Sequence, residues 1–529
     1  MKPVRVLGLD GMSLSTLETL TGLGLMPHAS ELLSACSATP LRSTIPFSTI
    51  PGWASIFTGV LPGEHGLLWW KREDPWLPWR EPKQRGFTSF HDSPRPPLWD
   101  LLDSAGLRTS FLDIPASFPA PPTNGVFVSG FLGPWPHPRA INPPELRSAA
   151  AGWLESDAGI GDSSERSVDE LARAVRELAQ ATDQRFELYS STFDESCDLT
   201  FQVLVGPDRL SHVCWPELIP HGDGSGSVTD AMACYWTSVD KFFKPLLHAR
   251  GEGETVIICS DHGSTSPPRH RFQLLPWLAQ EGYAPGPGSS STRTTRTVEQ
   301  TVDRLRHSLR PLIKTMGAEN MARSARDKVR SALWRASQAS PKDTVVFGVV
   351  MGDHEAGFFL SPNSSDRTAI VQELTERLQG VDHQGSPLFR EVGRPERFIG
   401  PVRDGERIPD LIAISREEVG ISQGLGGGSV FVTEPKPRRG VHERQGVLVV
   451  GGEQPPVRED AAVEDITPTI LSLLNVRPPE WMQGACLLDA APIKSVGHVA
   501  PSGDAEGAAL SPEEESAIQD HLRGLGYVE

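Results

Sequence analysis

Short runs of Val, Ile and Leu alternate along this sequence with longer stretches in which apolar residues recur every three or four positions. Runs of the first kind are typical of buried strands, and stretches of the second kind are typical of amphipathic helices. The helical period is clearest over residues 167–193 and 228–247. This alternation predicts an α/β fold with a doubly wound, mainly parallel sheet that helices cover on both faces. The expected strands lie at 4–9, 109–114, 199–205, 255–259, 411–414 and 446–450.

Breaks in this pattern divide the chain into a core and an insertion. Helical spacing within a locally basic stretch indicates an inserted helical cap after the strand at 255–259. Near the C-terminus, a stretch rich in Gly, Ala and Ser indicates a linker. Ser511 and Pro512 suit the start of a following helix, and Gly524 can end it. The expected parts are a first core portion over 1–264, the inserted cap over 265–405, a second core portion over 406–496, and the linker with a C-terminal helix over 497–529.

Composition and charge narrow the functional classes. The chain has 529 residues, and its 50 Lys and Arg against 67 Asp and Glu give a formal net charge of −17. An acidic surface repels a phosphate backbone, so we expect no nucleic-acid partner. The six cysteines include no C-x-x-C pair, which disfavours a disulfide scaffold or a thiolate zinc site. Without a signal peptide or an apolar run of roughly 18 residues, we expect a cytoplasmic protein that does not enter a membrane. The oligomeric state stays open.

Within the expected cap, residues 293–335 carry eleven Lys or Arg and four Asp or Glu, a local balance of +7. The commoner role of such a segment is a solvated helical face. The alternative is a surface that draws anionic substrates towards the site.

Residues with carboxylate, imidazole or hydroxyl groups stand at the ends of several expected strands. In open α/β sheets, ligands bind outside the carboxyl ends of the strands, so these residues are candidates for chemistry. Any one of them could instead cap a helix or fill another structural role. Together, three Asp, three His and one Thr could hold two divalent ions and leave positions open for a substrate. The set is Asp10, Thr49, Asp208, His212, Asp261, His262 and His442.

Two threonines compete for the role of a reactive hydroxyl. Thr44 and Thr49 each stand two residues before a proline, and either could be a turn residue. Only Thr49 leads directly into an amphipathic segment, which contains Trp53, Ile56 and Phe57. We therefore expect Thr49 at a helix N-terminus, where the backbone favours negative charge.

Several of these motifs together resemble the alkaline phosphatase superfamily over nearly the whole chain. The resemblance is to its type I phosphodiesterase and nucleotide pyrophosphatase branch, and most closely to the predicted phosphohydrolase/phosphomutase group. The motifs that carry it are Gly8-Leu9-Asp10-Gly11, Thr49-Ile50-Pro51, Pro62-Gly63-Glu64-His65-Gly66, Leu98-Trp99-Asp100, residues 208–212, Ser260-Asp261-His262-Gly263, Gly440-Val441-His442 and Leu525-Gly526-Tyr527.

The resemblance implies two metal sites, with Zn²⁺ as the leading candidate ion and Mn²⁺ as the other. It also implies that Thr49 is the nucleophile, because coordination to a divalent cation makes a threonine alkoxide accessible near neutral pH. The implied ligand groups are Asp10, Thr49, Asp261 and His262 around one ion, and Asp208, His212 and His442 around the other.

The sequence departs from the pyrophosphatase pattern where substrate is bound. That branch has an Asn shortly after its His-Gly pair, and Trp70 stands there in this chain, which speaks against nucleotide diesters. Lys71, Arg72 and Arg209 are candidate substrate-binding residues because their positive charge could hold a phosphate. Each of them, taken singly, could also be a solvated or ion-paired residue. We expect a phosphorylated small molecule as substrate, either a monoester or a diester.

The leading hypothesis is a two-metal phosphoric ester hydrolase that acts through a phosphothreonine at Thr49. Its rival is a phosphotransferase or phosphomutase, because the same intermediate could be passed to an alcohol. A hypothesis of another class is a catalytically silent, metal-stabilised binding module, against which the complete ligand set argues.

Overall fold

The structure is a computed structural model that describes most of the chain. The described residues are 2–70, 86–134, 137–147, 167–193, 196–219, 227–284, 344–403, 408–424, 429–434, 440–452, 458, 460–488, 494–495, 499 and 510–524. The predicted basic segment at 293–335 and nearly all of the predicted linker at 497–509 therefore lie outside the described residues.

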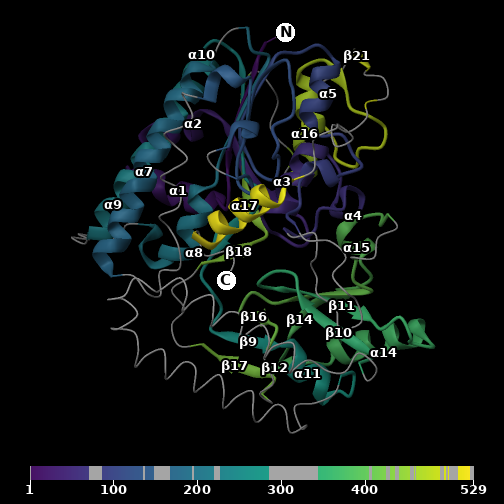
Figure 1. Ribbon diagram of the computed structural model, residues 1–529. Coiled ribbons are helices and arrows are strands. Elements are labelled where there is room, and N and C mark those ends of the chain that lie inside the picture. The colour runs from purple at the N-terminus through teal and green to yellow at the C-terminus, as the bar shows by residue number, and fades with distance from the viewer. Residues whose placement is uncertain are drawn as a thin grey trace.

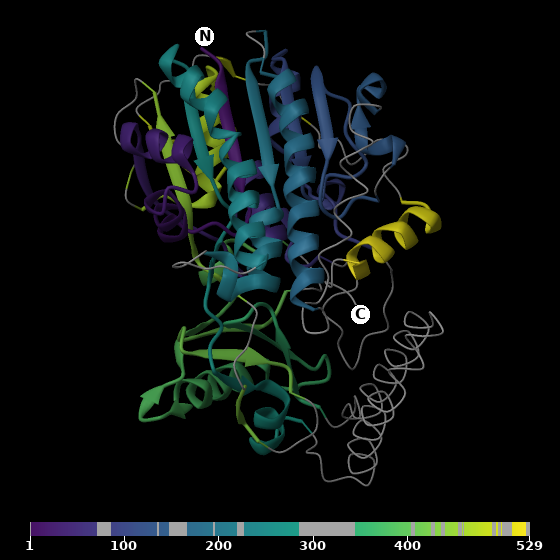
Figure 2. The ribbon, with the colours of Figure 1, turned by 90° about the vertical axis from the view of Figure 1, so that its left-hand side faces the viewer.

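An eight-stranded sheet forms the centre of the molecule (Figures 1 and 2). Its five middle strands run parallel, whereas β19 runs antiparallel to both of its neighbours and β5 runs antiparallel to β4. The predicted doubly wound, mainly parallel sheet is confirmed. The strands, in spatial order, are β2 (Ser37–Arg42), β19 (Gln445–Gly451), β7 (Thr255–Cys259), β1 (Val4–Leu9), β6 (Leu199–Leu204), β3 (Thr109–Ile114), β4 (Gly125–Ser129) and β5 (Ile141–Asn142).

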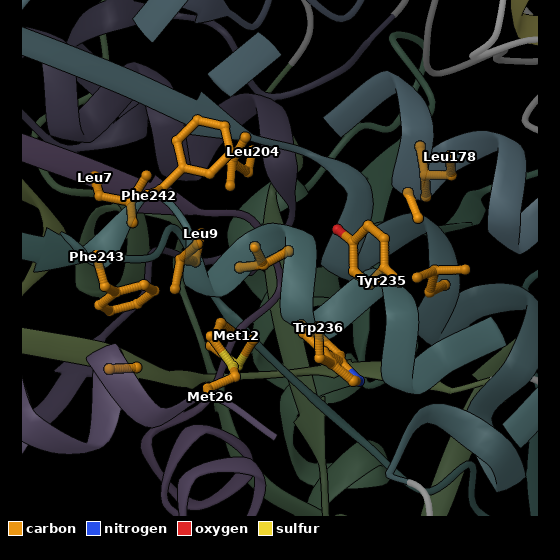
Figure 3. Close-up of a cluster of buried hydrophobic side chains, with 14 of the residues drawn as sticks. Leu7, Leu9, Met12, Met26, Leu178, Leu204, Tyr235, Trp236, Phe242 and Phe243 are labelled. Carbon is orange, nitrogen blue, oxygen red and sulfur yellow. The ribbon is translucent and has the colours of Figure 1, made fainter. Parts of the chain in front are cut away.

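Both faces of this sheet are covered, so its central strands are buried throughout. All six residues of β1 are buried. Because side chains alternate along a strand, Leu7 and Leu9 join one apolar cluster and Val4 and Val6 join the other. Figure 3 shows the first cluster, in which Leu7 and Leu9 lie near Phe242 and Phe243.

Helices divide between these two clusters. The predicted helix at 228–247 proves to be two helices, α9 and α10, separated by a short turn. On the side of the first cluster lie α1 (Leu14–Gly22), α2 (Pro27–Ala35), α7 (Val168–Ser191), α8 (Gly206–Leu218), α9 (Ser227–Asp240) and α10 (Phe243–Gly251). On the side of the second lie α3 (Thr49–Thr58), α5 (Leu98–Ser104) and α16 (Ile466–Leu473), with α4 (Pro62–His65) following α3.

The insertion lies beyond the carboxyl edge of the central sheet and is built largely on sheets of its own (Figure 1). One antiparallel sheet has the order β10-β11-β15-β14, and a smaller one has the order β16-β9-β17. The elements are β9 (His270–Gln273), α11 (Leu274–Gln280), β10 (Val346–Val350), β11 (Glu355–Leu360), α14 (Arg367–Gln379), β12 (Asp382–His383), β13 (Ser386–Pro387), β14 (Phe389–Gly393), α15 (Glu396–Ile399), β15 (Leu411–Ser415), β16 (Val419–Ser422) and β17 (Phe431–Thr433).

One expectation about the insertion needs correction. Its predicted end at residue 405 is too early, because β15 pairs with β11 and β14, and β16 and β17 both pair with β9. The physical reason is that a five-residue apolar run such as β15 is equally suited to either sheet, and only its pairing decides which one it joins. The helical segment expected within the cap lies outside the described residues.

The predicted C-terminal helix is present as α17 (Pro512–Gly524). The Ser511 hydroxyl accepts a hydrogen bond from the backbone N–H of Glu514, whose side chain accepts one from the backbone N–H of Ser511. Ile518 and Leu522 are buried in the second apolar cluster. The parallel pair β20 (Val476–Arg477) and β21 (Lys494–Ser495) completes the fold. Within the described residues, every helix is too short or too polar to cross a bilayer.

Candidate active site

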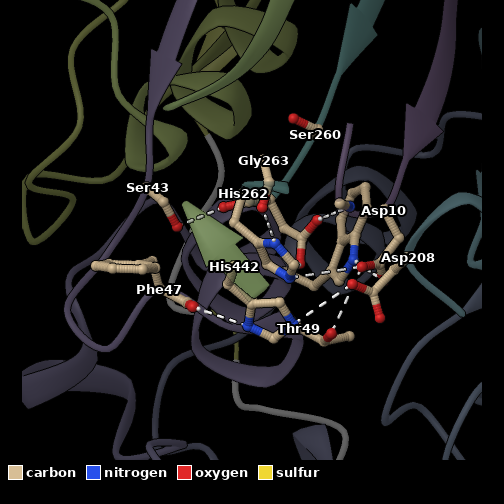
Figure 4. A network of polar contacts seen from close by, with 12 residues as sticks. Asp10, Ser43, Phe47, Thr49, Asp208, Ser260, His262, Gly263 and His442 are labelled. Atoms are coloured by element: carbon tan, nitrogen blue, oxygen red, sulfur yellow. Dashed lines mark hydrogen bonds and ion pairs between the residues drawn. The ribbon is translucent and has the colours of Figure 1, made fainter. Parts of the chain in front are cut away.

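The seven predicted metal-site residues come together where the central strands end. Figure 4 shows Asp10, Thr49, Asp208, His262 and His442 from close by. Their elements are far apart in sequence, but parallel strands bring their carboxyl ends to one edge of the sheet. Asp10 follows β1, Thr49 begins α3, Asp208 and His212 lie on α8 after β6, Asp261 and His262 lie between β7 and β8 (Gly263–Thr265), and His442 lies in β18 (Val441–Glu443), which pairs with β8.

Asp10 is fixed from the helix that carries Thr49. The Trp53 indole Nε1–H donates to Asp10 Oδ2 at 2.9 Å, and the Thr49 hydroxyl faces Asp10 Oδ1 at 3.5 Å. Trp53 lies one turn after Thr49 in α3, so a single helix positions both groups. Thr44, by contrast, donates its hydroxyl to the carbonyl of Pro46 at 2.7 Å, a contact within the turn before α3.

Asp208, His212 and His442 form a second cluster. Asp208 Oδ1 lies 3.3 Å from His212 Nε2 and 3.4 Å from His442 Nε2, and the two imidazole Nε2 atoms are 2.8 Å apart. Asp208 can reach this position because Gly11 adopts a positive φ of 69° and has no Cβ, which would lie 2.9 Å from the Asp208 Cβ.

All three histidines turn their Nε2 atoms towards the carboxylates. Their Nδ1 atoms face backbone carbonyls, with His212 3.3 Å from Gly440 O, His262 2.9 Å from Gly263 O and His442 3.2 Å from Phe47 O. A carbonyl can only accept a hydrogen bond, so each Nδ1 carries a hydrogen and each Nε2 atom points into the site. The Nε2 atoms of His212 and His442 are 2.8 Å apart, so a proton or a metal ion has to separate their lone pairs.

Burial shifts the ionisation of these groups strongly. It raises the pKa of Asp10 and of Asp261 well above the ordinary value, and the negative charge of Asp208 adds to both shifts. For Asp208 itself burial acts in the same direction, but His212 and His442 outweigh it and hold the pKa well below the ordinary value. Burial lowers the pKa of His262 to about 3. Three carboxyl groups in one buried site are therefore costly without positive charge among them.

The donor set fits divalent cations. Ligand atoms of Asp208, His212 and His442 lie within 4.8 Å of one another, and so do those of Asp10, Asp208 and His262. Asp261 adds an oxygen, Oδ2, that lies 3.2 Å from His262 Nε2. Neither of these two buried atoms makes a hydrogen bond within the described part of the chain. Carboxylate oxygen and imidazole nitrogen are the donors that Zn²⁺ and Mn²⁺ accept in proteins.

The predicted substrate-binding residues have different outcomes. Arg209 is buried beside Asp208, its guanidinium lies 5.9 Å from the centre of the Phe131 ring, and its charge partly offsets the raised pKa of Asp10. It therefore lies close to the site. Lys71 and Arg72 lie outside the described residues.

Sequence reasoning missed several groups that hold the site together. Trp53 had a usable signal, since it stands one helical turn after Thr49 and is buried. Ser43, which donates to the carbonyl of Asp261 at 2.5 Å, had none. Phe47 acts through its backbone carbonyl, which no side-chain pattern can reveal. Asp353, from the insertion, lies within electrostatic range of His212 and contributes to raising the pKa of His212.

Comparisons with known proteins agree with this geometry. The family described as type I phosphodiesterase / nucleotide pyrophosphatase matches residues 4–442. Over 140 residues, the chain is 29% identical to 2,3-bisphosphoglycerate-independent phosphoglycerate mutase from Parasynechococcus marenigrum (strain WH8102), a match that covers 26% of this chain and only 23% of that relative.

Solved structures show the same fold. Phosphonoacetate hydrolase from Sinorhizobium meliloti 1021, in complex with phosphonoformate, aligns with a TM-score of 0.51 and 14% identity, covering 89% of this chain and 95% of that chain. Its complex with phosphonoacetate gives a TM-score of 0.50 over the same shares of the two chains, also with 14% identity. At this level of identity the likeness shows the fold alone.

Proposed function

Because the chain belongs to the type I phosphodiesterase / nucleotide pyrophosphatase family of the alkaline phosphatase superfamily, we propose that it is a two-metal phosphoric ester hydrolase with Thr49 as its nucleophile. Family membership supports an enzyme of phosphoryl transfer over a catalytically silent binding module. The two-metal chemistry and the role of Thr49 are the proposal.

The position of the Thr49 hydroxyl carries this proposal. Thr49 is buried, begins a helix, and faces Asp10 Oδ1 at 3.5 Å among the gathered Asp and His side chains. Ser48, the residue before it, makes no capping hydrogen bond through its side chain, so the start of α3 stays open to a phosphoryl group. Divalent ions, when bound, would lower the pKa of the hydroxyl and neutralise charge on the phosphoryl oxygens.

The residues of the chain would then divide the work of two displacement steps. The Thr49 oxygen forms a bond to phosphorus as the ester oxygen leaves, and Asp10 orients the hydroxyl for this attack. Arg209 would hold a phosphoryl or neighbouring anionic group of the substrate, with Lys71 and Arg72 as further candidates from sequence. Water then cleaves the phosphothreonine and restores the hydroxyl.

The proposal also assigns the ligand groups, the metal ions, the class of substrate and the compartment. We take Asp10, Thr49, Asp261 and His262 as one ligand group and Asp208, His212 and His442 as the other, with Zn²⁺ favoured over Mn²⁺. The substrate would be a phosphorylated small molecule, and the enzyme would work in the cytoplasm.

A phosphotransferase or phosphomutase is the second candidate, favoured by the local similarity to a phosphoglycerate mutase. It would use the same phosphothreonine but pass the phosphoryl group to an alcohol. The two candidates differ only in the acceptor.

A panel of chromogenic phosphomonoesters and phosphodiesters with added Zn²⁺ or Mn²⁺ tests the proposal. We expect turnover that chelation abolishes and that about two equivalents of metal restore. Running the same assay with added glycerol separates the candidates, because a transferase forms glycerol phosphate in preference to inorganic phosphate. A fully active protein with a single bound ion would refute the two-metal chemistry.

A further inference from the structure

We infer that Phe47 is a positioning residue that transmits the docking of the insertion to the imidazole of His442, an inference that rests on the proposed role of His442 as a metal ligand. Phe47 belongs to the core and lies two residues before Thr49. Its backbone faces the site, whereas its side chain faces the insertion.

The backbone of Phe47 orients His442. Its carbonyl oxygen accepts the hydrogen bond of His442 Nδ1 at 3.2 Å, as Figure 4 shows. This bond fixes the tautomer and the rotation of the ring and so aims Nε2 at Asp208 Oδ1, 3.4 Å away. The other two imidazoles are held by different carbonyls, His212 by Gly440 O and His262 by Gly263 O.

The side chain of Phe47 is held from the insertion. Its ring is 3% exposed and belongs to an apolar cluster that joins the two parts of the molecule. From the core the cluster contains Ile45, Phe47, Leu68 and Trp69, and from the insertion Met351, Phe398, Ile399, Ile412 and Ile414.

Polar groups of the insertion also surround Phe47. The His354 ring stacks on the Phe47 ring with 6.3 Å between centres, and His354 Nδ1 is fixed by Ser415 Oγ at 3.2 Å. The turn between β10 and β11, which carries His354, therefore packs on the ring of Phe47.

The consequence is that the insertion takes part in building the metal site without supplying a ligand. If the insertion were displaced, the Phe47 peptide would lose its support, and both the His442 ring and the adjoining Thr49 would lose their fixed orientation. Changing such a hydrogen-bonding partner of a metal ligand typically costs 10- to 100-fold in metal affinity or activity.

Four variants of the full chain test this inference. Phe47→Ala removes the ring, and Phe47→Leu restores apolar volume as the conservative rescue. Phe359→Ala is the matched control, because Phe359 is equally buried but pairs with Phe347 in a separate cluster of the same insertion sheet. Ile414→Val removes one methyl group from the insertion side of the cluster, and it tests the inference if Phe47→Ala does not fold.

Calorimetric titration of each metal-free protein with Zn²⁺ gives a readout that does not need turnover. We expect Phe47→Ala to weaken one of the two binding events about 10-fold and to lower kcat with little change in KM. Phe47→Leu should recover most of the affinity, Ile414→Val should show a smaller loss in the same direction, and Phe359→Ala should bind Zn²⁺ like wild type.

The outcomes separate this inference from the proposed function. Equal Zn²⁺ affinity in all folded variants of an actively hydrolysing enzyme would overturn the role of Phe47 and leave the hydrolase intact. The expected order of affinities in a protein that hydrolyses no ester would support the positioning role and overturn the proposed function.

Discussion

The site contains two groups of candidate metal ligands, both made of carboxylates and imidazoles, that differ in burial. In the outer group, Asp208, His212 and His442, the His212 ring is 26% exposed and the His442 ring 16%. In the inner group, Asp10, Asp261 and His262, every side chain is fully buried. Burial and neighbouring charge together therefore determine which atom of each group holds a proton in competition with a cation.

Protons compete with a cation at different atoms in the two groups: at the imidazole of His212 in the outer group, and at the carboxyls of Asp10 and Asp261 in the inner one. Burial acts to lower the pKa of His212, but the negative charge of Asp208 outweighs it and raises the pKa to about 9. Burial lowers the pKa of His262 to about 3, so this imidazole stays neutral and ready to ligate at any ordinary pH. An ion in the outer group must therefore displace a proton from His212, whereas an ion in the inner group must displace the protons that burial favours on Asp10 and Asp261.

The largest effect should come from Thr49, which adjoins the inner group. Thr49→Ala removes the nucleophile, and we expect kcat to fall by about three orders of magnitude or more while Zn²⁺ binding changes little, because the inner carboxylates and His262 remain. Acid quenching and peptide mass spectrometry of wild type should locate phosphate on Thr49.

Thr49→Ser and Thr44→Ala are the controls for this prediction. Thr49→Ser keeps the hydroxyl and should keep measurable turnover, and Thr44→Ala should behave like wild type because its hydroxyl bonds within a turn. Phosphate on the peptide at Thr44, or full activity in Thr49→Ala, would show that the nucleophile is misassigned.

The next effect tests whether the two groups are independent. An oxygen of Asp208 lies close enough to share a cation with either group. Asp208→Asn should therefore weaken both Zn²⁺ binding events, each by about 10-fold or more. His442→Ala should weaken only the event in the outer group. Calorimetric titration distinguishes the two patterns, and a loss confined to one event in Asp208→Asn would mean that the groups do not share this carboxylate.

The sequence predicts the positions of some site residues but not how deeply each is buried. Asp10, Asp208 and Asp261 directly follow apolar runs that form parallel strands, so their position at one edge follows from the fold class. Burial depth does not follow, because it depends on helices and an insertion that pack from elsewhere in the chain. Phe47 orients His442 through a backbone carbonyl, which no side-chain pattern reveals. The sheet that β15 joins cannot be predicted either, because its apolar run suits both sheets.

The Glu355 carboxyl is buried and belongs to neither group of candidate metal ligands. Burial raises its pKa from 4.5 to about 8, so between these values the folded protein holds a proton that the unfolded chain has lost. The free energy of unfolding should therefore fall as pH rises through this window, by about 1.4 kcal/mol per pH unit from this group. Glu355→Gln stays neutral and should lack that component.

Urea unfolding of both proteins at pH 5, 6, 7 and 8, with chelator present throughout, measures the difference. The variant should gain stability relative to wild type as pH rises, with the gain levelling off above about pH 8. Glu417→Gln, at an exposed side chain of the insertion, is the matched control and should show no such trend. Parallel curves for Glu355→Gln and wild type would mean that Glu355 ionises in the folded state near its ordinary pKa.

The smallest effect should come from a single methyl group placed against the inner group. Gly52 lies in α3, and a Cβ there would lie 2.8 Å from the Cβ of Asp261 and 3.0 Å from its carbonyl oxygen. Backbone cannot yield cheaply, so Gly52→Ala should cost about 1–3 kcal/mol of stability through overpacking, despite the better helix propensity of Ala. It should also weaken the inner Zn²⁺ event while leaving the outer one nearly unchanged, because the strain falls on Asp261.

Gly22→Ala is the matched control, since it lies at the end of α1 with no atom within 4 Å of the added Cβ, and it should be neutral or slightly stabilising. Thermal unfolding and Zn²⁺ titration of the two variants decide the matter: equal affinity for both ions in Gly52→Ala would show that the inner group tolerates displacement of α3 and is not held as tightly as its burial implies.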